Sequence, residues 1–468
     1  MKKIYFTQEM TTSSNSLYVD VQQQDVSNEE EWMGIYIKGK KIGYAMTSTT
    51  KVAEGYQVVE QLFMQLLVMG SYKRITSVLH SLVREDFSIQ SFELVLHAES
   101  VVFKIKGEVV GKRLKLKIFT GGEEREETLP LKRIPHLSSG ISGFLAHEGF
   151  VVGKECALSI FDPSTMSQNN VTVKVEKREK IMMGSEEIVA YRLRTSYGGV
   201  DLYTWVTPDG VRLKEEGFLG ITLLREDKDK ACKVDETIKM DLIELSKISS
   251  NVEIKKPHAL KSLKIRLTNM NVDNFSLSGT RQQQSEDVVE ITRENIDEIP
   301  NFELPYTESE YAEYLVATSL LQSDAPQLIR EAKRIIGSEK DALQAVQLFS
   351  QWMSTHVKKN PTFSVPSALE VLRSRIGDCN EHAALFTALC RAVGIPAKVC
   401  VGIVYSEGDF YYHAWSEVYL GKWVSVDPLM NQLPADVTHI KFVEGELEDQ
   451  MGLMEVVGKL KVEVLEYQ

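Results

Sequence analysis

The stretch RIGDCNEHAALFTALCRAVGIPAKV, residues 375–399, decides the fold of the C-terminal part of the chain. Asp378 and Glu381 have the spacing of a capping box, which places Cys379 at the first position of a helix. Free backbone N–H groups and the positive end of the helix dipole favour a thiolate there. The neighbouring Asp378 carboxylate acts in the opposite direction. Position alone therefore leaves two readings of Cys379 open, a buried structural thiol or a nucleophile.

The segments that precede this stretch have apolar residues at helical spacing. TESEYAEYLVATSLL opens with a Thr307-x-x-Glu310 capping box. It is followed by three more segments with helical spacing, APQLIREAKRIIG, SEKDALQAVQLFSQWMSTHVKK and PSALEVLRSR. After the Cys379 helix come three strand-like runs, AKVCVGIVY, FYYHAWSEVYL and KWVSVDP. Helices followed by strands, without βαβ alternation, predict an α+β domain over 306–447.

The first half of the chain alternates apolar and polar residues between turn signals. WMGIYIKGKKIGYAMTST predicts two strands around Gly39, and LYTWVTPDGVRLKEE predicts two more around a PDG turn. Many short strands predict a mainly antiparallel β domain over 1–240, either a barrel or a curved sheet. The more polar stretch 241–305 predicts a connecting β module, with a loop at TRQQQSEDV and a linker, and 448–468 predicts a C-terminal strand. A multidomain protein is the natural expectation for 468 residues.

Composition and missing motifs exclude several classes of protein. A net charge of −12 without a dense Lys/Arg cluster argues against nucleic-acid binding. Five scattered cysteines imply no disulfide framework, and the lack of CxxC and HExxH motifs argues against zinc. No signal peptide or membrane-spanning segment is visible, so we expect a cytoplasmic protein, or one of the cell envelope or periplasm if the start is truncated.

The base for a reactive Cys379 is expected from a different element of structure. His382 shares the helix of Cys379, so His413, in the strand-like YYHAWSEVYL, is the better candidate. If residues 419–421 form a three-residue hairpin loop, His413 lies directly opposite Asp427 on the same face. A carboxylate in that place can orient the imidazole and stabilise the imidazolium. A two-residue loop would shift this register by one.

Residues 306–447 closely resemble the transglutaminase-like superfamily of papain-like thiol enzymes. The resemblance rests on the Gly-Asp-Cys step, AVGIPA at the helix end, His-Ala-Trp, and WVSVDP, with Leu429 standing where Thr is common. WMGIYIKGKKIGYA and the closing GKLKVEVLEY are similar, more weakly, to the β-rich N-terminal region and terminal strand of bacterial multidomain members. The resemblance implies that Cys379 is the nucleophile, His413 the base and Asp427 the orienting carboxylate.

Two function classes follow from these residues. One is a thiol-dependent acyl-transfer enzyme that forms a Cys379 thioester with a protein or peptide substrate. Within it, hydrolysis of a peptide or amide bond is expected ahead of protein cross-linking, because amine transfer needs a site that excludes water and admits a lysine. The other class is a non-catalytic binding or scaffold protein that uses the β-rich N-terminal half.

The remaining expectations concern ions and the oxyanion. The acidic runs, such as GGEEREE (121–127), lack the Asp/Asn alternation and glycine of a calcium loop, so we expect no metal and no cofactor. The backbone N–H of Cys379 is the natural first oxyanion donor, and the second donor is left open. Trp352 is expected to be a core residue. Trp415 either shields the Cys–His pair or simply packs.

Overall fold

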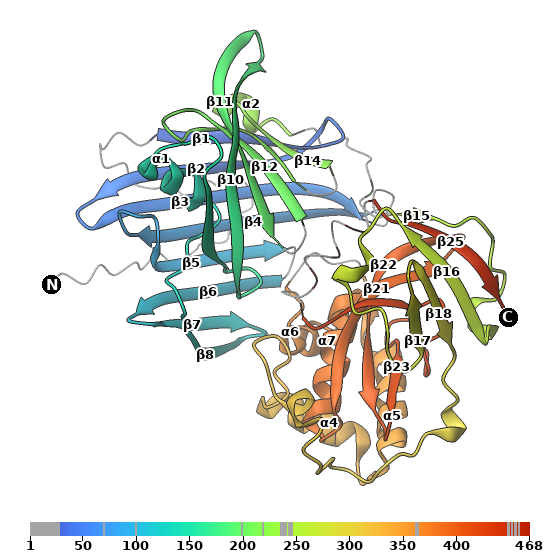
Figure 1. Cartoon of the computed structure of the whole chain (residues 1–468). Helices are drawn as coiled ribbons and strands as arrows, with labels where there is room; N and C mark the ends of the chain where they lie inside the picture. Colours follow the sequence, from blue (N-terminus) through green and yellow to red (C-terminus); the bar gives the residue numbers. More distant parts are fainter. Residues whose placement is uncertain are drawn as a thin grey trace.

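The computed structural model describes residues 29–68, 71–98, 101–197, 200–217, 220–234, 241, 247–360, 365–446, 450, 453, 456 and 459–468. The expectation about a signal peptide concerns residues 1–28, which lie outside the described residues. The chain forms a large antiparallel sheet in its N-terminal half and a smaller α+β part in its C-terminal half (Figure 1). Within the described ranges, no helix has the length and apolar character needed to cross a membrane.

The N-terminal half is one fourteen-stranded sheet in the order β8-β7-β6-β5-β4-β3-β2-β1-β14-β13-β12-β11-β10-β9. Neighbouring strands are antiparallel, and β1 pairs with β14 to join the two runs of strands. The sheet is open and curved rather than a closed barrel, because β8 and β9 stand at its two ends (Figure 1). The strands are β1 (Glu29–Ile37), β2 (Lys40–Val52), β3 (Gly55–Val68), β4 (Ser71–Val83), β5 (Ile89–Ala98), β6 (Val101–Val110), β7 (Arg113–Thr120), β8 (Glu123–Pro130), β9 (Glu155–Asp162), β10 (Ser167–Met183), β11 (Glu186–Tyr197), β12 (Val200–Val206), β13 (Arg212–Glu216) and β14 (Ile221–Arg225).

Strict alternation gives strands such as β7 a buried face. In β7, Leu114, Leu116 and Ile118 are almost completely buried, whereas the lysines between them are exposed. A period of two places alternate side chains on opposite faces, so one face supplies a core and the other meets water. Helix α1 (Gly140–Glu148) inserts Leu145 into a second core formed with strands β9 to β12, and α2 (Lys228–Ala231) follows β14. The predicted antiparallel β region is confirmed as a curved sheet.

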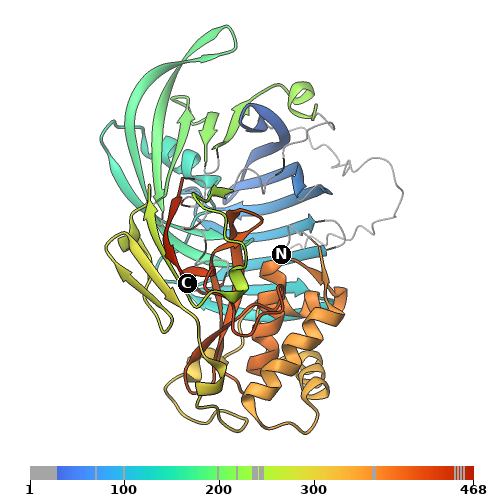
Figure 2. The ribbon, with the colours of Figure 1, turned by 90° about the vertical axis from the view of Figure 1, so that its right-hand side faces the viewer.

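Among the described residues of the C-terminal half, four helices, α4 to α7, pack with a five-stranded sheet, as the predicted α+β domain requires. The sheet has the order β15-β22-β21-β24, with β23 on β22, and a separate sheet in the order β17-β18-β16-β25 lies on the side away from the helices (Figure 2). The elements are β15 (Ile248–Ser249), η2 (Pro257–Ala259), β16 (Ser262–Thr268), η3 (Val272–Asn274), β17 (Gln282–Ser285), β18 (Val288–Thr292), η4 (Ile296–Glu298), η5 (Ala312–Leu315), α4 (Pro326–Ile336), α5 (Ala342–His356), β19 (Lys358–Lys359), α6 (Ala368–Ser374), β20 (Ile376–Gly377), α7 (Cys379–Ala392), β21 (Ala397–Ser406), β22 (Asp409–Tyr419), β23 (Trp423–Val426), β24 (Ile440–Glu444) and β25 (Lys461–Tyr467).

The helix predicted over TESEYAEYLVATSLL is wrong. Only the 3-10 turn η5 forms there, and Thr307 caps no helix. Leu320 packs into the core of the N-terminal sheet, whereas the adjacent Leu321 packs into the C-terminal core. The Tyr311 ring instead packs against the ring of Tyr419 in a tilted arrangement, with the ring centroids 4.3 Å apart. Neighbouring residues that are buried in different cores cannot share one helical stripe, so tertiary packing overrides the local pattern.

The loop predicted at TRQQQSEDV is also wrong, because it forms the hairpin of β17 and β18. Glu286 has a positive φ of 55° in its turn. Gln282 is 2% exposed and exchanges two hydrogen bonds with the backbone of Lys441, at 2.7 and 3.0 Å. An amide side chain can satisfy a backbone donor and acceptor together, which allows Gln282 to be buried.

The two halves meet where the β7–β8 turn packs on α6. The Gly121 N–H donates to Glu370 Oε2 at 2.9 Å, and Arg125 pairs with Asp324 at 2.8 Å. Val365 joins the buried core of the N-terminal sheet. The large sheet thus supports the short helix α6, which is followed by β20 and then by Cys379. The C-terminal strand β25 pairs with β16, so it joins the sheet formed by strands of the 241–305 segment.

Candidate active site

The start of α7 holds Cys379 in the predicted geometry. The Asp378 side chain accepts from the Asn380 N–H at 3.2 Å, and Glu381 reaches back to the Asp378 N–H at 3.1 Å, which completes the capping box. Gly377 makes this return possible, since a Cβ there would lie 2.3 Å from Glu381 Cβ. Cys379 is half-buried at the first helical position.

We expect Gly377→Ala to push Glu381 out of the capping box. The free energy of unfolding should fall by about 1–2 kcal/mol, because both a cap and a well-packed contact are lost. Denaturant unfolding measures this loss. Gly279→Ala is the control, since its Cβ would be 3.6 Å from Lys441 Nζ, an ordinary contact. Equal stability of the two variants would contradict this account of the turn.

The Cys379 thiol is not acidic by itself. Burial raises its pKa well above the usual range, and the carboxylates of Asp378, Glu381 and Asp427 raise it further. A hydrogen bond from the backbone N–H of Ala414 to the sulfur acts in the opposite direction. The advantage of the helix N-terminus is therefore outweighed, and the thiol needs a base to lose its proton. The Ala414 contact also brings the sulfur beside the residue that follows His413.

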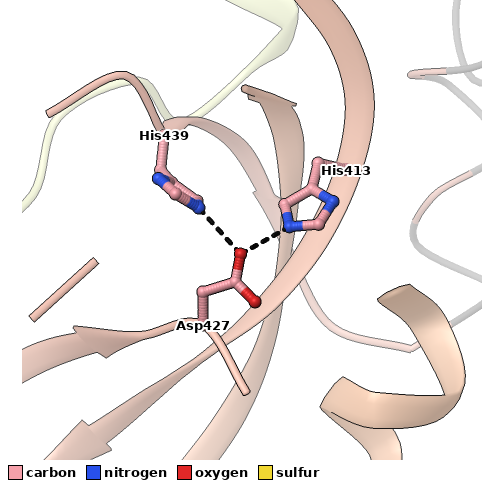
Figure 3. A group of neighbouring side chains, drawn as sticks. All are labelled: His413, Asp427 and His439. Carbon is pink, nitrogen blue, oxygen red and sulfur yellow. Dashed lines mark hydrogen bonds and ion pairs between the residues drawn. The ribbon is translucent and has the colours of Figure 1, made fainter. Parts of the chain in front are cut away.

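His413 and Asp427 form a buried pair. His413 Nε2 lies 2.7 Å from Asp427 Oδ2 (Figure 3). Asp427 Oδ1 accepts from the N–H groups of Leu429 and Met430, each at 2.8 Å. Burial would raise the pKa of Asp427, but the His413 imidazole and the hydrogen bonds from two histidines hold it well below its usual range. An ionised carboxylate only accepts, so His413 Nε2 carries a proton and Nδ1, which points away from Asp427, is left as the basic nitrogen.

The predicted hairpin register is wrong by two residues. Tyr419 pairs with Trp423, so the loop is 420–422 rather than 419–421. His413 and Asp427 are therefore diagonal neighbours instead of directly opposite each other. A shift of two keeps every side chain on its face, and a diagonal pair is within reach of an imidazole. The predicted contact forms despite the wrong register.

A second histidine, His439, completes this group and was not among the residues predicted from the sequence. Its Nε2 lies 3.0 Å from Asp427 Oδ2, while its Nδ1 lies 3.2 Å from the carbonyl oxygen of Asp436 (Figure 3). His439 immediately precedes β24, and its side chain is fully buried. The only local signal is a histidine at the start of the strand-like run HIKFV, twelve residues after Asp427.

Comparison with known proteins identifies a family for this part of the chain. Residues 330–428 match the family model described as the transglutaminase-like superfamily. The C-terminal part of the chain is a transglutaminase-like domain. The match includes Cys379, His413 and Asp427, whereas His439 lies beyond its end.

The similar proteins match only parts of this chain. A peptide-N(4)-(N-acetyl-beta-glucosaminyl)asparagine amidase of Drosophila melanogaster is 38% identical over 73 residues, which are 15% of this chain and 10% of that protein. The chain thus spans about a tenth of this relative. A protein of Cytophaga hutchinsonii, provisionally named a cysteine protease, has 18% identity and a TM-score of 0.30, covering 44% of this chain and 86% of its own. A β-barrel-like protein of Brucella abortus has 11% identity and a TM-score of 0.32, covering 42% and 94%.

The other histidine and tryptophan residues singled out in the sequence pack within the domain. His382 is buried, and its Nδ1 donates to the carbonyl of Asp378 at 2.7 Å, so it holds the helix start. Trp352 lies in the C-terminal core, stacked on the ring of His356. Trp415 is 1% exposed, with its ring 6.2 Å from that of His413 and 5.3 Å from that of His439. The five cysteines are all free, and Cys390 and Cys400 are buried.

We expect the transglutaminase-like domain to work without a metal ion. The ligand atoms of His413, Asp427 and His439 lie within 4.8 Å of one another, a spacing that can hold an ion. All three side chains are buried, however, and the Asp427 oxygen already accepts from both imidazoles. Cysteine activation by a histidine needs no metal. Thiol-dependent turnover should therefore survive exhaustive chelation, and loss restored by added zinc or calcium at unchanged folded fraction would contradict this expectation.

Proposed function

We propose that the protein is a cysteine-dependent amidase or peptidase, with Cys379 as nucleophile, His413 as base and Asp427 as orienting carboxylate. The observation that carries the proposal is the buried hydrogen bond between His413 and Asp427. Ala414, which follows His413 in the strand, contacts the Cys379 sulfur. A nucleophile, a base and an orienting group on separate elements are the usual parts of covalent acyl transfer.

The steps of the reaction follow from which of these groups carry protons. His413 Nδ1 takes the thiol proton as Cys379 Sγ attacks the carbonyl carbon of the substrate. The Cys379 N–H, at the first position of α7, is the proposed first donor to the developing oxyanion. The C–N bond then breaks, and His413 returns its proton to the leaving amine. Water then attacks the thioester carbon as His413 takes one of its protons. The C–S bond breaks and releases the acid, and the thiolate of Cys379 regains a proton from His413.

Hydrolysis is the favoured outcome of the thioester. The relative with 38% identity bears the name of an amidase, an enzyme class in which water resolves the acyl group. Amine transfer makes further demands, namely exclusion of water and admission of a lysine. We therefore propose an amide bond in a protein or peptide as the substrate class, with water as the acceptor.

Turnover of a peptide and amide library tests this proposal. The wild-type protein should release amine from a subset of the library, and Cys379→Ala should release none. Cys156→Ala is the matched control, because this half-buried cysteine lies in β9, and it should retain full turnover. Turnover that persists in Cys379→Ala would exclude the thiol mechanism. Amine exchange without hydrolysis would instead identify a cross-linking transglutaminase.

A further inference from the structure

The surroundings of His439 contain acceptors at both ring nitrogens. Nε2 faces Asp427 Oδ2 at 3.0 Å, and Nδ1 faces the carbonyl oxygen and Oδ1 of Asp436, at 3.2 and 3.3 Å. Asp436 Oδ1 itself accepts from the N–H and the O–H of Thr438, at 2.9 and 2.6 Å. Carbonyls and ionised carboxylates do not donate, so only an imidazolium satisfies both nitrogens of His439.

The charges around His439 favour the same form. Burial alone would lower its pKa, but the hydrogen bonds to Asp427 and Asp436 outweigh burial and raise the pKa to about 9. His413 and Trp415 of β22 also face this cluster, with rings 5.6 and 5.3 Å from that of His439. Asp436 Oδ2 accepts from Gln432 Nε2 at 3.1 Å and lies 3.4 Å from His258 Nδ1, and Arg281 donates to the Asp436 carbonyl at 2.6 Å. Within the described residues, no lysine or arginine is paired with the Asp427 carboxylate.

A clamp from outside the family-matched segment fixes the loop that carries Asp436. Arg281, at 8% exposure, donates to the carbonyl oxygens of Ala435 and Asp436 at 2.7 and 2.6 Å, and pairs with Glu294 at 3.0 Å. Arg281 immediately precedes β17, and Glu294 follows β18, so the four-stranded sheet holds this loop. His439 is thus held by the pairing of β24 with β21 and by the contacts of Arg281 with the loop that precedes it.

We propose that His439 is a positioning residue that remains an imidazolium, neutralises the Asp427 carboxylate and fixes the oxygen that orients His413. The inference rests on the proposed function and deepens it. The Asp427 charge raises the pKa of the Cys379 thiol, so a cation held on that carboxylate offsets this effect. The sharing of one oxygen by two imidazoles also keeps His413 Nε2 a donor, which leaves Nδ1 free for the thiol.

The test is the pH dependence of Cys379 alkylation by iodoacetamide, which needs no known substrate. His439→Gln removes the charge but keeps an amide donor. The midpoint of the alkylation profile should move to higher pH by roughly half a unit or more, because the Asp427 charge is no longer offset. His147→Gln, an exposed site on α1, should leave the profile unchanged. A purely structural role would slow alkylation equally at every pH, and an unmoved midpoint would overturn the proposal.

A second measurement is independent of Cys379. In ¹⁵N NMR spectra of the wild-type protein, both ring nitrogens of His439 should carry protons at pH 8, because the pKa is about 9. A bare nitrogen at pH 8 would overturn the inference whatever the thiol does. If both protons are present but wild-type Cys379 reacts no faster than buried Cys390 at any pH, the proposed function fails, and with it the positioning role of the imidazolium.

Discussion

Replacement of His413 by alanine is expected to abolish turnover as completely as replacement of Cys379. Each variant should lose roughly 10³-fold or more in kcat/KM, and the double variant should be no worse, because residues that act as one unit are not additive. Asp427→Asn should be impaired less severely, since the amide keeps the position of the orienting group. Steady-state kinetics on the best substrate of the library measures all four proteins.

His382 supplies the comparison for this prediction. It lies one turn after Cys379, but its Nδ1 is already bonded to the carbonyl of Asp378. His382→Ala should therefore weaken the helix start without removing the base. Near-normal turnover in His413→Ala together with an inactive His382→Ala would show that the base is assigned to the wrong histidine. Thermal unfolding of each variant separates loss of chemistry from loss of fold.

Arg281→Ala should give the largest loss of stability. The change leaves Glu294, whose side chain is 6% exposed, without its buried cationic partner, and it frees two buried carbonyls. Removal of one member of a buried ion pair typically costs about 3–5 kcal/mol, because the remaining charge stays desolvated.

The matched control is Arg266→Ala in β16 of the same sheet. Arg266 pairs with Glu463 at 2.8 Å, but both side chains are considerably exposed, at 40% and 52%. Pairs of this kind contribute about 0–1 kcal/mol. Denaturant unfolding should therefore separate the two variants clearly. Similar free energies of unfolding would mean that the Arg281 clamp does not hold the loop that carries Asp436 and His439.

Local signals predicted the parts of the site that depend on short-range structure. The capping box placed Cys379 at the start of α7, and alternation placed His413 and Asp427 on one face of a hairpin. The exact register was not predicted: the hairpin loop lies one position further along the chain than expected. Gly421, whose φ is 85°, lies within both the predicted and the observed loop, so the turn residue itself does not distinguish the two registers.

The missed features depend on contacts between segments distant in the sequence. His439 reaches Asp427 only because β24 pairs with β21, and that pairing has no local signature. The polar run TRQQQSEDV forms a hairpin because Gln282 bonds to the backbone of Lys441, 159 residues away. The joining of β1 to β14 is similarly non-local. Sequence patterns specify elements, whereas these partnerships arise only in the assembled core.

The account is tested most directly by the selectivity of thiol alkylation, read by mass spectrometry of the native protein. Near neutral pH, Cys379 should be modified well before Cys156, Cys232, Cys390 and Cys400, and His413→Ala should remove that advantage, because the buried thiol depends on the imidazole to lose its proton. Modification of Cys379 at the same rate as the other four, or at a rate unchanged by His413→Ala, would contradict the assignment of a Cys–His pair.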